Sequence, residues 1–462
     1  MKLKEIICST ALTLVVSITG GTVFTENVHA TDAVPQSADS NTVSIEEKHA
    51  LIEELSRNIY LTPVHKLEIL NGKLHFLMPE DEGLANTLLS TIRKMCWITD
   101  LSLFPYQFAS LPRMRFPQNI KKLNLSHGKM TSLSELEHFT SLEKLNLSCC
   151  SSSVDLGWMR ANNRLRRLYL HGTHVKSLDV LMECPNLEEL DISSCHVVRL
   201  QQLPASLKVL DMSDSFTEIP LNLLRGCPNL KSLNLSGRVH LRNLGCVSDN
   251  KELNVLRLFN TSVTSLSALK GCEKLEELDL MNCNGLKDLK GVPASLRILD
   301  VRGSRITSLN EVEGCTSLEK LDASYCGGLK DLKGVPVSLR ILNIRKSGIT
   351  SLNELEGCTS LEELDASHCE GLKDLRGVPS SLKILNIRKN GIASLNGVEG
   401  CTSLEELNAS GCNNLKNEDF EKLLALPKLR TICAPRSNHP GDISEEELVA
   451  RFSERHIDIR FY

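Results

Sequence analysis

Apolar residues recur along most of the chain in a six-residue pattern, Leu-x-x-Leu-x-Leu, in which other apolar or small residues replace Leu at some positions. The alternation in the last three residues favours a short strand with one face buried. Successive patterns begin 20 to 25 residues apart. A segment that recurs in such constant phase predicts a stack of similar units, which we call rungs. The first residues of the sixteen patterns are Ile98, Ile120, Leu142, Leu165, Leu187, Leu207, Leu230, Leu253, Leu275, Leu296, Leu318, Leu339, Leu361, Leu382, Leu404 and Leu429.

This period lies within the range of leucine-rich repeats and predicts an α/β leucine-rich-repeat solenoid over residues 98–435. We expect a curved parallel β-sheet, because each rung adds one strand and buries its leucines against its neighbours. The segments that return between strands are short and interrupted by Pro and Gly, so the convex side should be mostly 3₁₀ or extended. Residues 417–428 are the exception and are expected to form a helix. From Leu275 onward a 43-residue unit of two rungs repeats almost unchanged.

The ends of such an array need polar caps. Residues 44–97 are predicted to form a helical N-terminal cap of helix, hairpin and helix, with the first helix capped by Ser44 and Glu47. Asn71-Gly72 between apolar alternations predicts the hairpin. Residues 436–462 are predicted to form a C-terminal cap, with a helix that begins after Ser444 and a final strand in 456–462.

The first thirty residues have the pattern of a secretory signal peptide. Lys2 and Lys4 precede an apolar run over residues 6–24, and small residues stand at Val28 and Ala30. This order favours cleavage after Ala30 and export of the mature chain to the periplasm, the exterior or a host. A membrane anchor is the alternative, but Gly20-Gly21 interrupts a run that should contain about 20 apolar residues. Residues 31–43 are predicted to be a disordered linker, and no membrane span is expected after signal removal.

Composition narrows the possible functions. The chain has 462 residues, a formal net charge of −4 and only 4% aromatic residues. This charge does not favour binding to nucleic acid. Nucleotide-binding, metalloprotease and serine-hydrolase motifs are absent from the sequence, so we expect no catalytic residues and no cofactor. The Asp-rich column described below is not expected to hold a metal, because arginines adjoin it.

Cysteine occurs at two regularly recurring positions of the rungs. One column contains Cys283, Cys326, Cys369 and Cys412, and its members recur every second rung, about 10 Å apart by strand spacing. Disulfides need Cα atoms within about 7 Å, so neither column can pair internally. We therefore predict buried free thiols that bond weakly to the turn backbone, and a stray disulfide at the less regular Cys149, Cys150 or Cys246 stays open. Free thiols fit a reducing destination such as a host cytosol. The second column contains Cys272, Cys315, Cys358 and Cys401.

Outward-facing strand positions are available to a partner. One outward column alternates in charge from Glu276 to Glu405, which predicts a ladder of ion pairs that supports solubility and register. A second column is rich in Asp and is edged by Arg, and Arg and Tyr are frequent anchors of protein interfaces. The candidate partner-binding residues are Asp300, Arg302, Asp322, Tyr325, Arg345, Asp365, Arg388 and Phe259.

The rungs resemble bacterial leucine-rich repeats over about 98–435. The form LRILNIRKSGITSLNEL is similar to internalin repeats, VPASLRIL resembles repeats of secreted effectors of the YopM and IpaH type, and LEELDLMNCNGL resembles the cysteine-containing class. This resemblance implies a curved solenoid that binds a protein partner, with a role in host interaction or virulence. The chain departs from the asparagine ladder of internalins, because mostly Cys, Ser and Thr occupy that position.

Three functional hypotheses follow. The first is an exported protein that binds another protein, of unknown identity, through its concave face. The second is a structural, envelope-associated array without a discrete ligand. The third, an enzyme built on residues 31–97, has few candidate nucleophile–base pairs to support it.

Overall fold

The computed structural model describes residues 43–79, 81–104, 117–130, 132–151, 153–215, 220–436 and 442–462. The predicted signal peptide and nearly all of the linker lie outside these residues. The chain divides into two compact units, which are described separately. Unit 1 contains the residues up to Leu187 and Val197–Arg199, and unit 2 contains Glu188–His196 and Leu200–Tyr462.

Unit 1 begins with the cap. Helix α1 (Ile45–Ser56) starts where the sequence predicts it, because the Ser44 side chain accepts from the Glu47 amide and the Glu47 carboxylate accepts from the Ser44 amide. Helix α3 (Glu82–Ile92) is capped by Asp81.

The predicted hairpin around Asn71-Gly72 is wrong. Its first half is helix α2 (Pro63–Leu70), which Thr62 caps and which begins at Pro63. These two residues favour the start of a helix more strongly than the alternation of apolar residues favours a strand. Its second half is strand β1 (Lys73–Leu77), which pairs in parallel with β2 (Asp100–Phe104) rather than with a hairpin partner. Gly72 at φ +83° makes the turn between helix and strand.

The parallel sheet of unit 1 runs β1, β2, β3, β4, β6, with Leu74, Leu101, Leu123, Leu145 and Leu168 in matching register. Its remaining strands are β3 (Lys122–Asn124), β4 (Lys144–Asn146) and β6 (Arg167–Tyr169). A separate three-stranded sheet is formed by β5 (Ser153–Val154), β7 (His174–Ser177) and β9 (His196–Arg199).

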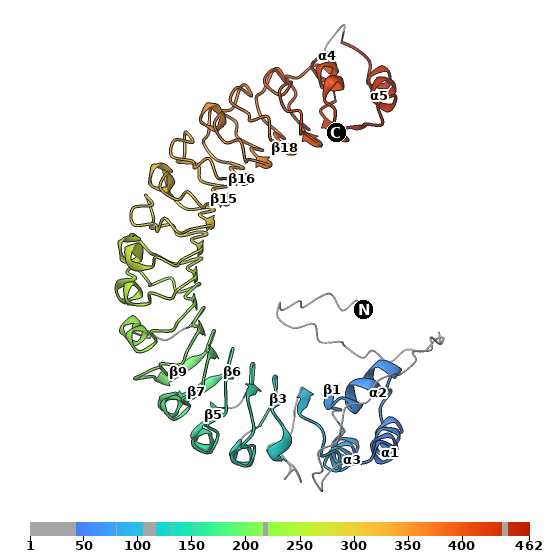
Figure 1. Cartoon of the computed structure of the whole chain (residues 1–462), viewed down its shortest axis with the longest axis vertical. Coiled ribbons are helices and arrows are strands. Elements are labelled where there is room, and N and C mark those ends of the chain that lie inside the picture. Colours follow the sequence, from blue (N-terminus) through green and yellow to red (C-terminus); the bar gives the residue numbers. More distant parts are fainter. Residues whose placement is uncertain are drawn as a thin grey trace, which may run out of the picture. The chain divides into compact units, whose positions relative to one another are not determined.

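Unit 2 is a stack of rungs that confirms the predicted solenoid. Its parallel strands lie along the concave side of the curve in Figure 1, from the green to the red part of the chain. Register is constant, so that Leu321 pairs with Leu342 and Leu342 with Leu364, and these leucines are at most 1% exposed. The strands are β8 (Glu189–Asp191), β10 (Val209–Asp211), β11 (Ser232–Asn234), β12 (Val255–Arg257), β13 (Glu277–Asp279), β14 (Ile298–Asp300), β15 (Lys320–Asp322), β16 (Ile341–Asn343), β17 (Glu363–Asp365), β18 (Ile384–Asn386), β19 (Glu406–Asn408), β20 (Thr431–Ala434) and β21 (Asp458–Phe461). Strand β9 (His196–Arg199) contains residues of both units.

The convex side consists of 3₁₀ turns and extended chain, as predicted. From Leu275 onward 3₁₀ turns occur in the rungs that begin at Leu296, Leu339 and Leu404. The rungs that begin at Leu275, Leu318 and Leu361 have Gly-Val-Pro in their return segments and no 3₁₀ turn, and the rung of Leu382 has none either. The helix expected over 417–428 is shorter than predicted, with α4 (Asn417–Glu421) giving way to a 3₁₀ turn. Helix α5 (Glu445–Ser453) and β21 form the C-terminal end as expected. The 3₁₀ turns are Pro117–Asn119, Ser134–His138, Gly157–Ala161, Asp179–Glu183, Leu221–Gly226, Gly245–Asp249, Ser267–Gly271, Asn310–Val312, Asn353–Leu355 and Lys422–Ala425.

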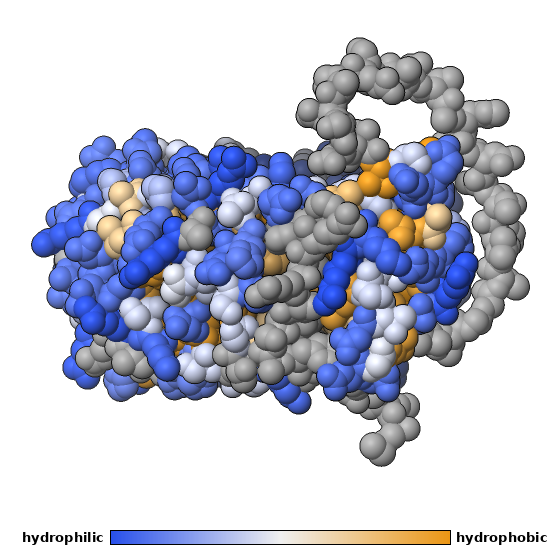
Figure 2. All heavy atoms as spheres, turned by 90° about the horizontal axis from the view of Figure 1, so that it is seen from below, coloured by the Kyte–Doolittle hydropathy of each residue, from blue (hydrophilic) through white to orange (hydrophobic). Residues whose placement is uncertain are grey.

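Leucines fill the interior, and the surface is mainly polar. Figure 2 shows a face on which hydrophilic residues predominate and hydrophobic residues reach the surface in small separate patches. Exposed large apolar side chains of the cap include Tyr60, Val64 and Leu67. Scattered exposure of this kind is normal for folded proteins.

The two cysteine columns are buried, and their thiols link successive rungs. In the first column the Cys326 Sγ donates to the Val301 carbonyl at 3.2 Å, and the Cys369 Sγ donates to the Ile344 carbonyl at 3.1 Å. In the second column the Cys315 Sγ donates to the Pro293 carbonyl at 3.4 Å. All cysteines whose side chains the structure describes are free, Cys149 and Cys150 included. The side chain of Cys246 lies outside the described residues.

We predict that alkali destabilises the fold through these thiols. Burial raises the pKa of Cys150, Cys184, Cys227 and Cys401 to about 11, from an ordinary value of 9.0. Between these values the unfolded chain loses thiol protons that the folded chain keeps, so stability falls as the pH rises from 9 towards 11. The loss should approach roughly 2 kcal/mol per thiol. Guanidinium unfolding under reducing conditions at pH 8 and at pH 10.5 measures this loss of unfolding free energy.

The control is the variant in which these four cysteines are replaced by Ser, because other residues of the chain ionise above pH 10 as well. Its unfolding midpoint should fall less steeply with pH than that of the natural chain. Equal slopes for the two proteins would contradict the assignment.

Candidate functional site

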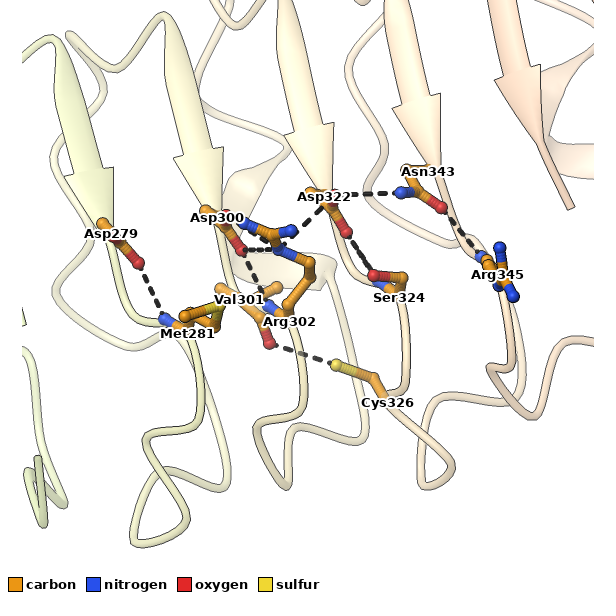
Figure 3. A network of polar contacts seen from close by, with 10 residues as sticks. All are labelled: Asp279, Met281, Asp300, Val301, Arg302, Asp322, Ser324, Cys326, Asn343 and Arg345. Carbon is orange, nitrogen blue, oxygen red and sulfur yellow. Dashed lines mark hydrogen bonds and ion pairs between the residues drawn. The ribbon is translucent and has the colours of Figure 1, made fainter. Parts of the chain in front are cut away.

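Most strands of unit 2 end in a turn in which four consecutive residues are hydrogen-bonded. In the rung of β15, the Ala323 amide donates to the Asn343 carbonyl at 2.8 Å, and the Tyr325 amide donates to the Arg345 carbonyl at 2.7 Å. The Ser324 amide donates to the Asp322 Oδ1 at 3.0 Å (Figure 3). Together with the bond from Cys326 to the preceding rung, these contacts satisfy the polar backbone that the turn buries. We call this arrangement the strand-end turn.

The Asp and Asn column belongs to the strand-end turn. An Oδ1 atom of each of these residues accepts from the amide two residues later, which is the geometry of an Asx turn. The carboxylates are also half-buried, with side-chain exposures of 19% for Asp300 and 14% for Asp322. The side chains of this column therefore already have a structural role in the strand-end turn. It comprises Asn124, Asn146, Asp191, Asp211, Asn234, Asp279, Asp300, Asp322, Asn343, Asp365, Asn386 and Asn408.

A second column has left-handed backbone. Tyr325 stands at φ 59°. The equivalent residue in each of the remaining rungs from His127 to Gly411 also has positive φ. This conformation costs a residue with a Cβ about 1–2 kcal/mol, which is why Gly and Asn are favoured in it. The non-glycine members are His127, Cys149, Ser194, Asp214, Asn260, Asn282, Tyr325, Lys346, His368 and Lys389, and the glycines are Gly172, Gly237, Gly303 and Gly411.

Three of the predicted partner-binding residues lie together. Arg302 folds back on Asp300, with its Nη2 2.6 Å from the Asp300 Oδ2, and its Nε lies 3.6 Å from the Asp322 Oδ2 (Figure 3). The hydrogen bond with Asp300 raises the pKa of Arg302 further above its usual range. On the neighbouring strand, burial raises the pKa of Asp279, and the Asp300 charge adds to this effect. Arg302 thus neutralises part of the acidic charge of this face within the protein.

The other candidates are spread along the sheet. Tyr325 is 51% exposed, and the Lys346 Nζ lies over its ring at 5.0 Å from the centroid. Arg345 is half-buried and Arg388 is exposed. Phe259 is half-buried two strands before Arg302, so it lies apart from the rest. Asp365 is half-buried and accepts from the Ser367 amide at 2.9 Å.

Sequence reasoning missed two sets of outward residues. Ile298 and Ile384 are each 37% exposed at the third position of their rungs, and Ile341 holds the equivalent position in β16. Lys346 and Lys389 were not chosen as candidates, although they share the left-handed position with glycines. The recurrence of Gly and Asn at this position is the sequence signal from which a strand-end turn could have been predicted.

The charge ladder at the strand starts is confirmed. The Arg297 Nη2 lies 2.7 Å from the Glu319 Oε1, and the next pair joins Arg340 to Glu362 at 2.6 Å. Lys383 contacts the same Glu362 from the other side at 2.7 Å, and its hydrogen bond is the main cause of the lowered pKa of Glu362. The ladder is exposed, so each pair contributes little to stability.

Within the described parts of the chain, no group of three or more His, Cys, Asp or Glu residues is arranged to hold a metal ion. The helices described there are all too short or too polar to cross a membrane. The expectation that the protein has no cofactor and no catalytic residues stays a prediction.

Comparison with known proteins identifies the repeat. Residues 251–294 match the family model described as leucine rich repeats in two copies, and residues 183–198 match a single leucine rich repeat. A leucine-rich-repeat protein of Leptospira interrogans superposes with a TM-score of 0.59 at 22% identity, covering 74% of this chain and 91% of that one. The functional domain of the internalin InlJ from Listeria monocytogenes, described as including a cysteine ladder, gives a TM-score of 0.52 at 20% identity. That superposition covers 83% of this chain and 79% of the internalin domain.

Curated relatives match only part of this chain. The disease resistance protein RML1A of Arabidopsis thaliana is 26% identical over 257 residues, which cover 51% of this chain. A Roc-COR-CHAT protease from an unknown prokaryote is 36% identical over 120 residues, or 25% of this chain. The matched regions cover 25% and 11% of these two proteins, so the chain spans a quarter of their length or less.

We predict that Asp322 contributes to stability through the strand-end turn. Asp322→Ala leaves the Ser324 amide and the Asn343 side-chain amide without their acceptor, and should lower the free energy of unfolding by about 1–3 kcal/mol. Asp322→Asn keeps an Oδ1 acceptor and should cost less. Lys320→Ala, on the same strand, is the matched surface control and should change stability by less than about 0.5 kcal/mol. Chemical unfolding followed by circular dichroism measures all three, and equal stability of the Ala and Asn variants would contradict the Asx role.

Proposed function

Because this chain is a leucine-rich-repeat protein, we propose that it binds a protein partner with the concave face of unit 2, and that it does so after export, as a host-interaction or virulence factor. The observation that carries the proposal is a set of outward side chains that the fold does not use. Isoleucines stand exposed on β14 and β18, two strands from the isoleucine of β16. The same rungs carry Arg302, Arg345 and Arg388 near their strand ends.

The combination of exposed isoleucines and arginines has the composition of an interface core. Protein interfaces are enriched in Arg and aromatic residues, with apolar groups at the centre and polar groups at the rim. Here Ile341 and Arg345 share one rung, and exposed Tyr325 lies on the adjacent rung. The strands hold these side chains rigidly, which limits the entropy lost when a partner binds.

The alternative of a structural array without a discrete ligand draws support from the Asp column, because the strand-end turns occupy it. It does not require isoleucine at the equivalent outward positions of β14, β16 and β18, Ile298, Ile341 and Ile384. The protein-binding proposal accounts for both sets of residues.

Export is supported by the N-terminal sequence alone. Lys2, Lys4, the apolar run of residues 6–24 and the small residues before position 31 have the order of a secretory signal. The many buried free thiols fit a protein that finishes in a reducing compartment, such as the cytosol of a host cell.

The binding face is tested by photo-crosslinking. A benzoylphenylalanine placed at Ile341 should give one adduct of fixed mass with extracts of candidate target cells, saturable and competed by the unmodified protein. The same group at Val337, which is 63% exposed in a return segment, is the matched control and should give no saturable adduct. Substituting Ile298 and Ile384 by Lys should weaken the Ile341 adduct. Equal or unsaturable labelling from both positions would favour the structural array instead.

Export is tested in the producing cell. The protein recovered from outside the cytoplasm should begin at Thr31, as measured by intact mass, and Ala30→Trp should leave the precursor uncleaved because a large residue blocks the peptidase site. Retention of the full-length chain in the cytoplasm would overturn this part of the proposal.

A further inference from the structure

Equivalent rungs of the repeated unit differ in charge at the strand-end turn. In the rung of β14, Asp300 neutralises Arg302, and Gly303 follows. In the rung of β16 the same three positions hold Asn343, Arg345 and Lys346, and in the rung of β18 they hold Asn386, Arg388 and Lys389. Each of the two later rungs therefore carries two positive charges where the earlier rung carries none.

The fold is preserved through this change. The Asn343 Oδ1 accepts from the Arg345 amide at 3.1 Å, and the Asn386 Oδ1 accepts from the Arg388 amide at 3.2 Å, as the Asp300 Oδ1 does in its rung. An amide oxygen completes the Asx turn as well as a carboxylate does, but it does not neutralise the arginine. The replacement of Asp by Asn thus removes negative charge without removing the structural contact.

The freed cations have no internal acidic partner, although Lys346 lies over the Tyr325 ring. Within the described chain, Arg345, Lys346, Arg388 and Lys389 make no ion pair, whereas Arg340 and Lys383 at the starts of the same strands are both paired with Glu362. The Arg345 Nε is buried and has no hydrogen-bond partner among these residues. A buried guanidinium nitrogen without a partner is costly. An external acceptor would have to reach the outer nitrogens of this half-buried side chain.

The two lysines stand at the left-handed position that the rungs share, at φ 52° and 55°, where Gly303 and Gly411 stand in other rungs. The side chain at this position varies from rung to rung, so the turn does not require lysine there. His368, on the rung between them, is also left-handed at φ 59°. Burial lowers the pKa of His368, and the charges of the four cations around it lower it further.

The spacing of the cations defines the ligand. Arg345 and Arg388 lie two strands apart, which is roughly 10 Å across a parallel sheet. A polyproline-II segment rises about 3.1 Å per residue with three residues per turn, so residues i and i+3 project from one side about 9.3 Å apart. The guanidinium fork binds carboxylates through two parallel hydrogen bonds. Nucleic acid is a poorer match, because it needs a longer basic stripe and stacking aromatics, and Tyr325 is the one aromatic residue beside this cluster among the described residues.

Resting on the proposed binding role of this face, we propose that Arg345, Lys346, Arg388 and Lys389 form a basic cluster around His368 that binds an acidic, extended segment of the partner. The segment lies across the strands in a polyproline-II conformation and presents a carboxylate at every third residue, one to the β16 rung and one to the β18 rung. Ile341 and Ile384 supply the apolar floor beside it.

The test uses a fluorescent twelve-residue peptide, Glu-Pro-Pro repeated four times, and a control peptide of the same composition with its four glutamates contiguous. Fluorescence anisotropy with the mature protein at low salt should show the regular peptide binding about tenfold more tightly. Arg345→Glu combined with Arg388→Glu should weaken its binding at least about tenfold. Lys290→Glu combined with Lys333→Glu makes the same charge change in return segments and should leave binding within about twofold. Arg345→Gln with Arg388→Gln, a milder pair with an unchanged unfolding midpoint, should also weaken binding.

Equal affinity for the two peptides, or equal loss in the two charge-reversed proteins, would overturn the proposal. Tighter binding of a twelve-nucleotide single strand with the same dependence on Arg345 and Arg388 would overturn it too, in favour of nucleic acid. If the peptides fail to bind while the saturable crosslink from Ile341 persists in the Arg345→Glu, Arg388→Glu protein, this inference fails and the proposed function stands. Loss of that crosslink in every protein would instead remove the proposed function.

Discussion

In most rungs of unit 2 the chain leaves its strand through the same hydrogen-bonded turn, and the binding face depends on that turn. A parallel strand of three residues is too short to fix its own register against slipping. The strand-end turn adds backbone bonds to the next rung, an Asx contact within the rung and a thiol or hydroxyl donor to the rung before. Every rung is thereby held in phase with its neighbours, and the outward side chains form straight columns.

This constraint separates structural positions from free ones. In most rungs the Asx position offers an oxygen acceptor, and Asp322 and Asn343 both do so, whereas Arg257 stands there in the β12 rung. The inward-facing residue at the end of the turn donates a hydrogen bond, and Cys, Ser, Thr or Asn stands there in most rungs, as at Cys369 and Asn390. Charge at the Asx position, and side-chain identity at the second and third positions after it, are left open by the fold, whereas the first position after it is a buried apolar residue such as Val301 or Ile344. Those are the positions at which the near-identical repeats diverge, from a neutral pair at Asp300 and Arg302 to free cations two and four rungs later.

The array itself was predictable because its period was repeated sixteen times in the sequence, so that each rung supported the assignment of the others. The cap was harder, because it occurs once. At Asn71-Gly72 a hairpin signal competed with the helix-start signals of Thr62 and Pro63, and the helix formed. The acidic column was identified correctly as a recurring feature, but its Asx bonds depend on a turn conformation that hydrophobic spacing does not reveal. The isoleucines at exposed positions were missed because strand alternation was read from the leucines alone.

The most direct test of this account is hydrogen exchange at single amides of the β15, β16 and β17 rungs. The account predicts that the amides of Ser324, Tyr325, Arg345 and Lys346, which lie outside the strands, are protected to the same degree as the strand amides of Leu321 and Leu342. Exchange of these turn amides at the rate of an unprotected loop would contradict it, because the columns that form the binding face would then have nothing to hold them in phase.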